Sequence, residues 1–116
     1  VPHTFIQTPN MAWGFYPAGV LAILPGPAWG PGEAIDNSDY VRTKKMTPYK
    51  YKACPETIRE LEKSMIRNAK GAFNPVNVGG NNCTGWACAR LEEAGFTPPS
   101  PSWMPYLTPW TLPKQR

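Results

Sequence analysis

The stretch NNCTGWACARL, at residues 81–91, marks the point where a Gly-rich loop turns into an amphipathic helix. Cys83 stands at the predicted helix start, where the positive end of the helix dipole and the unpaired first-turn N–H groups favour a thiolate over a thiol. We expect the helix to end at Gly95, a residue type that commonly terminates helices. Cys83 and Ala87 share one face of this helix, whereas Cys88 points well away from that face. Cys83 alone therefore has the position of a nucleophile.

The chain's only histidine, His3, lies far from Cys83 in sequence. Nucleophilic thiol catalysis needs a base, a group that orients the base, and donors for the oxyanion. His3 is the only imidazole available as the base. We expect the orienting group to be Gln7, which shares a strand face with His3, or else a backbone carbonyl. The expected oxyanion donors are the Cys83 N–H and the Asn82 side-chain amide, and Trp86 is the candidate for a substrate contact.

The composition describes one folded domain. The chain has 116 residues, of which 15 are proline and 10 glycine, so it is rich in loops. Its five Trp, five Tyr and four Phe nevertheless supply enough apolar area for a modest core. We therefore expect residues 1–116 to form a single domain.

The net charge of +4 limits the possible partners. A basic stretch contains Arg42, Lys44, Lys45, Lys50 and Lys52. This stretch has neither an RNA-recognition pattern nor a zinc-finger spacing, so we interpret it as a solvated face and expect no specific nucleic-acid partner. No apolar run reaches the roughly 18 residues that a membrane span needs, and no secretory leader is apparent. The start at Val1, without an initiator Met, suggests a piece of a larger polypeptide.

The cysteine count argues for a free thiol. Three cysteines are an odd number, so at least one of them stays unpaired. The separation of Cys83 from Cys88 does not fit a structural zinc site, and we expect neither a metal nor a cofactor. We interpret Cys88 and Cys54 as structural residues, Cys54 at a core junction ahead of a proline.

The first half of the chain predicts an antiparallel sheet. Residues 3–7 and 11–16 read as the two arms of a hairpin, and residues 20–24 form a third apolar run. We expect residues 25–39, rich in Gly, Pro, Asp and Asn, to be a surface excursion. Residues 40–52 are expected to contain one or two further strands.

The second half predicts two helices and a tail. The first helix is expected from Pro55 to about Lys70, with a core-facing stripe at helical spacing. The members of this stripe are Ile58, Leu61, Met65 and Ala69. Residues 73–82 are expected to form a loop before the Cys83 helix. We expect residues 97–116 to be an extended tail whose apolar side chains pack on the domain. Those side chains are Trp103, Tyr106, Leu107 and Trp110.

Four short motifs resemble the circularly permuted papain-like hydrolases, which include NlpC-type peptidases and lecithin:retinol acyltransferase-like proteins. The motifs are HTFI at residues 3–6, WGFYP at 13–17, CPE at 54–56 and NC at 82–83. They look most like the C-terminal toxin domains of bacterial polymorphic and Rhs-type effectors, over about residues 3–96. The resemblance implies an α+β fold in which two helices pack on a small antiparallel sheet, with Cys83 on a helix and His3 on the first strand. In these families the strand after the histidine strand usually carries a polar residue at the third catalytic position. Residues 11–16, the corresponding strand here, contain no charged residue.

The resemblance also implies an activity. It suggests a single catalytic domain, a thiol hydrolase or acyltransferase that attacks an amide or ester carbonyl through Cys83 and His3. Peptidoglycan peptide amides, a protein amide (protease or deamidase action) and lipid acyl esters all remain open as substrates. As a secreted effector delivered into a target cell, such a domain would have a cognate immunity protein as partner. The alternative is a non-enzymatic binding module that uses the basic stretch and the Trp- and Pro-rich tail.

Overall fold

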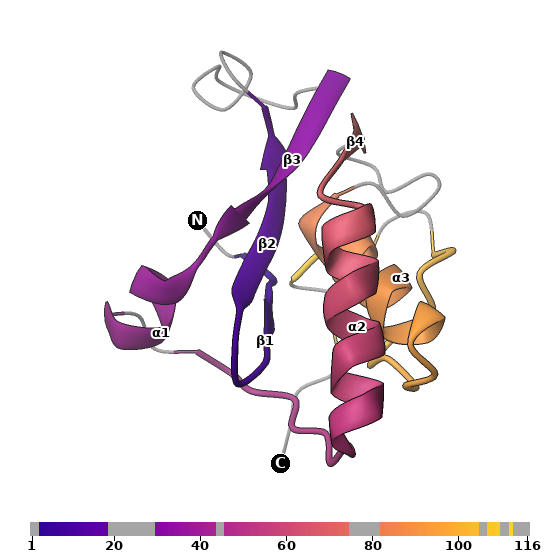
Figure 1. Ribbon diagram of the computed structural model, residues 1–116. Helices are drawn as coiled ribbons and strands as arrows, with labels where there is room; N and C mark the ends of the chain where they lie inside the picture. Colours follow the sequence, from indigo (N-terminus) through magenta and orange to yellow (C-terminus); the bar gives the residue numbers. More distant parts are fainter. Residues whose placement is uncertain are drawn as a thin grey trace.

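The computed structural model describes residues 3–18, 30–43, 46–74, 82–104, 107–109 and 112. Within them, one antiparallel sheet has the strand order β1-β2-β3-β4, accompanied by three helices. The elements follow the chain as β1 (Ile6–Gln7), β2 (Ala12–Pro17), β3 (Gly30–Asp36), α1 (Ser38–Thr43), α2 (Pro55–Arg67), β4 (Lys70–Phe73) and α3 (Cys83–Glu93). In Figure 1, α2 and α3 lie together on one side of the strands and α1 lies on the other. The predicted α+β class with an antiparallel sheet is confirmed.

The predicted hairpin is present at the start of the chain. Ile6 pairs with Trp13 in the antiparallel register of β1 and β2. The Thr8 N–H donates to the Met11 carbonyl at 2.8 Å and closes the turn between these strands. The first strand is shorter than expected, because only Ile6–Gln7 make ladder bonds and residues 3–5 are irregular.

An aromatic stack joins the sheet to the helices. Phe15 of β2 and Trp86 of α3 are nearly parallel, with ring centroids 5.7 Å apart, and both are almost fully buried. The surrounding buried cluster consists of Ile6, Leu61, Met65 and Ala87. The core therefore lies between the sheet and the pair α2 and α3.

Residues 25–39 were predicted to be a surface excursion, and for the described part this is wrong. Residues 30–36 form β3, which lies between β2 and β4 in the sheet. One of the glycines that suggested a loop, Gly32, has a packing reason, since a Cβ at this position would come within 2.6 Å of the Phe15 ring. The prediction for residues 20–24 lies outside the described residues.

The strands predicted within residues 40–52 are also wrong. Ser38–Thr43 form α1, and the described residues between α1 and α2 contain no strand. Asp36 explains this helix start, since its Oδ1 accepts hydrogen bonds from the Ser38 N–H at 3.1 Å and the Ser38 hydroxyl at 2.6 Å. An Asp side chain that accepts from the backbone N–H two residues on forms an Asx turn, which here turns the chain from β3 into α1.

The first predicted helix is confirmed, although it ends earlier than expected. α2 begins at Pro55 and ends at Arg67, and the chain then forms β4 at Lys70–Phe73, which the sequence did not predict. Leu61 and Met65 of the expected stripe are buried, and Ile58 and Ala69 are half-buried. No helix of the described part is long and apolar enough to cross a membrane.

The predicted Cys83 helix is confirmed at both ends. Asn82 is its N-cap, and the Asn82 Oδ1 accepts from the Gly85 N–H at 2.7 Å. The helix ends at Glu93, and Gly95 follows with a φ of 95°, a left-handed conformation that favours glycine.

The tail agrees with its prediction at one position and disagrees at another. Leu107 is 2% exposed, and its carbonyl accepts a hydrogen bond from the Asn82 Nδ2 at 2.7 Å. Trp103, in contrast, is 71% exposed, so the prediction that it packs on the domain is wrong. Tyr106 and Trp110 lie outside the described residues.

We predict that Leu107→Ala lowers the free energy of unfolding by about 2–5 kcal/mol, because it leaves a cavity in a buried site. Trp103→Ala is the matched control and should change it by less than about 0.5 kcal/mol, since that side chain is exposed. Urea unfolding of both variants measures the difference. Equal stability of L107A and the wild type would show that the tail contributes nothing to the core.

Candidate functional site

The chain's only histidine is held by an asparagine. His3 Nε2 lies 3.0 Å from Asn37 Oδ1. Asn37 is 4% exposed and sits between the end of β3 and the start of α1. Its N–H donates to the Ala12 carbonyl at 2.6 Å, and its carbonyl accepts from the Tyr40 N–H at 2.9 Å. The backbone of Asn37 is thus fixed on both sides, and its side chain holds the imidazole in one orientation.

This hydrogen bond also sets the tautomer of His3. An amide oxygen only accepts hydrogen bonds, so the His3 Nε2 that faces Asn37 Oδ1 carries the hydrogen. The neutral ring then has its free lone pair on Nδ1. Nδ1 is therefore the atom of His3 that can take a proton from a nearby group.

A tyrosine completes the cluster around the imidazole. The Tyr16 ring stacks on the His3 ring, with centroids 4.4 Å apart, and the Tyr16 hydroxyl accepts a hydrogen bond from Asn37 Nδ2 at 2.6 Å. Tyr40 and Phe5 make further ring contacts with His3 at 5.6 and 6.1 Å. His3 is consequently surrounded by aromatic rings.

These surroundings keep His3 uncharged. Burial lowers the pKa of His3 below its ordinary value of 6.5, and the hydrogen bond to Asn37 partly opposes this effect. Near neutral pH the imidazole is therefore uncharged, with its single ring hydrogen on Nε2. A base must be in this form to accept a proton.

Gly14 leaves the space in which the side chains of His3 and Asn37 meet. A Cβ built on Gly14 would overlap both His3 Nε2 and Asn37 Oδ1. Gly14 and Tyr16 lie two residues apart on β2 and so share a face, whereas Phe15 points to the opposite face and its Trp86 stack. The His3 cluster therefore forms on the sheet face opposite the main core.

Cys83 reaches the neighbourhood of this cluster at the start of α3. The Thr4 and Thr84 hydroxyls lie 2.8 Å apart, so the residues that directly follow His3 and Cys83 are in contact. Burial is the main cause that raises the pKa of Tyr16, and electrostatic interactions with Tyr40 and Cys83 add to it. Cys83 Sγ is half-buried, 3.8 Å from Thr84 Oγ1, and no described hydrogen bond joins it to His3.

The predicted orienting group requires a correction. Gln7 is exposed and pairs with Ala12 across the hairpin, while the group that contacts the imidazole is Asn37. No role was predicted for Asn37, because it lies within residues 25–39, which were interpreted as a surface excursion. The usable signal was the run Asp36-Asn37-Ser38, three residue types that favour helix starts.

The predictions for Asn82 and Trp86 also require correction. The Asn82 amide is buried, and both of its ends are hydrogen-bonded. Its Oδ1 caps α3, and its Nδ2 donates to the Leu107 carbonyl. Trp86 is 3% exposed, stacks on Phe15 and donates its Nε1–H to the Asn68 carbonyl at 2.9 Å. Asn82 is therefore a helix cap and Trp86 a core residue, neither of them facing a substrate.

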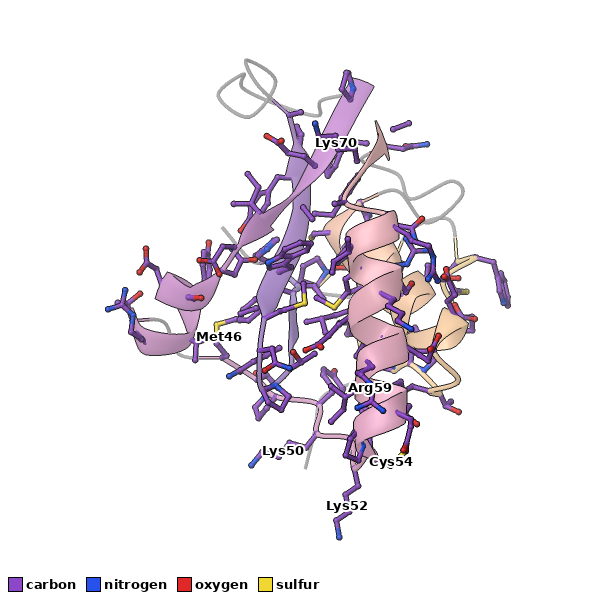
Figure 2. All side chains as sticks on the ribbon, viewed as in Figure 1. Met46, Lys50, Lys52, Cys54, Arg59 and Lys70 are labelled. Atoms are coloured by element: carbon purple, nitrogen blue, oxygen red, sulfur yellow. The ribbon has the colours of Figure 1, made fainter. Side chains whose placement is uncertain are left out.

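The other two cysteines differ in accessibility. Cys88 is buried, and burial raises the pKa of its thiol to about 11, so this thiol stays protonated. Cys54 is exposed, with its Sγ 3.2 Å from Thr57 Oγ1, and Figure 2 shows it at the N-terminal end of α2. The interpretation of Cys54 as a core-junction residue is wrong, because it lies outside the core.

A cleft opens beside the histidine. Its volume is about 810 Å³, and it runs between residues 3–9, residues 46–53 and one face each of α2 and α3. His3 and Phe5 line it together with apolar side chains such as Leu91 and Phe96. Cys83, Asn37 and Tyr16 are not among the described residues that line this cleft.

Comparisons of the chain with protein-family models, with curated proteins and with solved structures find no match.

We predict that Gly14→Ala separates His3 from Asn37, because the added methyl group would occupy the space between these side chains. The free energy of unfolding should fall by about 1–3 kcal/mol. Proton NMR should also show the loss of the hydrogen-bonded imidazole N–H signal. Gly71→Ala is the control, since its Cβ would meet only the Phe15 ring at an ordinary 3.9 Å. A persistent imidazole signal in G14A would contradict the described packing.

We predict that His3 makes the protein less stable in mild acid. Below about pH 6.5, His3 in the unfolded chain binds a proton that native His3, with its lowered pKa, does not bind. The free energy of unfolding should therefore fall as the pH drops from about 6.5 toward the lowered native pKa. Urea unfolding of the wild type and of His3→Gln across this range measures the effect, because the variant has no imidazole. An identical pH dependence of both proteins would contradict the prediction.

Proposed function

We propose that the chain is a thiol hydrolase or acyltransferase in which Cys83 is the nucleophile, His3 the base and Asn37 the group that orients the base. The observation that carries this proposal is the hydrogen bond from His3 Nε2 to the buried Asn37 Oδ1. With the hydrogen of the neutral imidazole on Nε2, the lone pair that can accept a proton is on Nδ1. Thr4, which follows His3, contacts Thr84 in the first turn of α3. A nucleophile, a base and an orienting amide are the parts that thiol catalysis needs.

The proposed reaction has two stages. His3 Nδ1 takes the proton of the Cys83 thiol, and the sulfur attacks the carbonyl carbon of an amide or ester. The C–N or C–O bond then breaks, the leaving group takes the proton from His3, and an acyl group stays on Cys83. Water or another acceptor next attacks this acyl group with His3 again as base, which releases the product and restores the thiol.

The biological role is proposed on the motifs alone. Residues 3–96 resemble effector toxin domains, so we propose a secreted bacterial effector that acts in a target cell and is neutralised by an immunity protein. Envelope peptides, protein amides and lipid esters remain its candidate substrates. Expression of the wild type and of Cys83→Ala, with and without export to the periplasm, tests this role. Mass spectrometry of the cells that respond only to the wild type identifies the modified molecule.

Acetylation of Cys83 by p-nitrophenyl acetate tests the chemistry. We use a Cys54→Ser background, because Cys54 is exposed and would react as well. We expect His3→Ala to slow the acetylation of Cys83 by about a hundredfold, the usual contribution of a general base. Asn37→Ala should slow it by about tenfold or more, whereas Gln7→Ala should leave it unchanged.

These variants also separate the possible errors. An unchanged rate in H3A would overturn the role of His3 and with it the proposed activity. If Gln7→Ala slows the acetylation of Cys83 and Asn37→Ala does not, Gln7 and not Asn37 orients His3. Mass spectrometry of the acetylated peptide shows whether Cys83 or Cys88 carries the group.

A second candidate, a binding module, is favoured by one observation. Trp103 is 71% and Met104 40% exposed, so two large apolar side chains lie next to each other at the surface, where a partner could cover them. Lys50 and Lys52 are also exposed and extend from the end of the molecule near Cys54 (Figure 2). This function would survive Cys83→Ala unchanged, so the same variant distinguishes it from the enzyme.

A further inference from the structure

The proposed reaction needs a side-chain donor that Asn82 does not supply. When the Cys83 sulfur attacks a carbonyl, negative charge moves to the carbonyl oxygen, and hydrogen-bond donors must face that oxygen. The Gly85 N–H is used by the Asn82 cap, but the Cys83 N–H has no acceptor within α3 and can provide one donor. The Asn82 amide instead caps the helix and holds the Leu107 carbonyl.

The hydrogen bonds around Asn37 leave a donor on Tyr16. Asn37 Oδ1 faces the N–H of His3, so the other end of this amide, Nδ2, donates to the Tyr16 hydroxyl oxygen at 2.6 Å. Tyr16 therefore acts as an acceptor toward Asn37, and its own O–H hydrogen can be donated to another acceptor. The stack on His3 at 4.4 Å holds the ring of this hydroxyl against the proposed base.

We propose that Tyr16 is a catalytic residue whose hydroxyl donates a hydrogen bond to the oxyanion formed during attack by Cys83. This inference rests on the proposed function. The C–S bond forms while the π electrons of the carbonyl move to its oxygen, and the Tyr16 O–H stabilises the charge without giving up its proton. When the oxygen re-forms the C=O bond, the leaving group departs with the proton held by His3.

The environment of Tyr16 suits this role. Burial raises the pKa of the phenol, with smaller contributions from Tyr40 and Cys83 in the same direction and an opposing one from Asn37. The hydroxyl thus keeps its hydrogen near neutral pH and remains a donor. The geometric link to Cys83 is the contact between Thr4 and Thr84, the residues that follow His3 and Cys83, together with the stack of Tyr16 on His3.

Two reagents separate a role in oxyanion binding from a role in holding His3. Alkylation of Cys83 by iodoacetamide displaces iodide and forms no oxyanion, whereas acetylation by p-nitrophenyl acetate forms one. In the Cys54→Ser background, we expect Tyr16→Phe to slow acetylation by about 10²–10³-fold, as loss of an oxyanion donor does. Alkylation of Cys83 should stay near the wild-type rate, because the phenyl ring still stacks on His3. Tyr51→Phe, which removes a hydroxyl bonded to the Thr97 carbonyl, is the control and should affect neither rate.

Tyr16→His is included because phenylalanine leaves the buried Asn37 amide without its acceptor. A histidine keeps a ring against His3 and offers both an acceptor and an N–H donor. We expect its ratio of acetylation to alkylation to lie nearer the wild type than that of any donor-free variant. Protection of the buried Cys88 from iodoacetamide shows that each variant is folded.

The outcomes distinguish this inference from the proposed function. Equal acetylation of Y16F and the wild type would overturn the role of Tyr16 alone. A parallel loss of alkylation and acetylation would also overturn it, since Tyr16 would then act only by positioning His3. If Y16F does not fold, Y16H decides the question. A ratio of acetylation to alkylation in Y16H that is a hundredfold or more below the wild-type ratio would also overturn the role of Tyr16. A wild-type protein whose Cys83 takes up no acetyl group would overturn the proposed function and this inference together.

Discussion

The stack of Phe15 on Trp86 is the contact on which the arrangement of the molecule depends. It joins the second strand of the sheet to α3, and both rings are almost completely buried. Two further features serve this contact: Gly32 leaves space for the Phe15 ring, and the Asn68 carbonyl accepts the Trp86 N–H. Because the stack sets the distance between sheet and helix, it also sets where the first turn of α3, with Cys83, meets residues 3–5.

The two faces of β2 pack against different parts of the molecule. Phe15 points to the helices and forms the core, while Gly14 and Tyr16 point to the other face, where His3 and Asn37 pack. Burial of His3 on this second face also has an electrostatic effect. It lowers the pKa of the imidazole and so favours the neutral form. A single strand thus connects the packing of the core with the protonation state of the proposed base.

Asn82 and Asn37 show how one residue type serves two purposes. Both amides are buried and bonded at each end. Asn82 uses its bonds to start α3 and to hold the tail at Leu107, whereas Asn37 links an imidazole to a phenol. The proposed chemistry depends on this division, since an amide engaged in capping a helix is not available to a substrate.

The sequence by itself determined the local features: the hairpin, α2 with its apolar stripe, and the helix that starts at Cys83 and ends before Gly95. These depend on side-chain periodicity and on capping residues, which act within a few positions of the chain. Only the tertiary structure decided that residues 30–36 are a central strand, that Trp86 is a core residue and that Asn37, not Gln7, contacts His3. Each of these depends on a partner far along the chain, such as the Phe15 ring that makes glycine necessary at position 32. Local patterns carry no information about such partners, because the contact exists only once the sheet has formed.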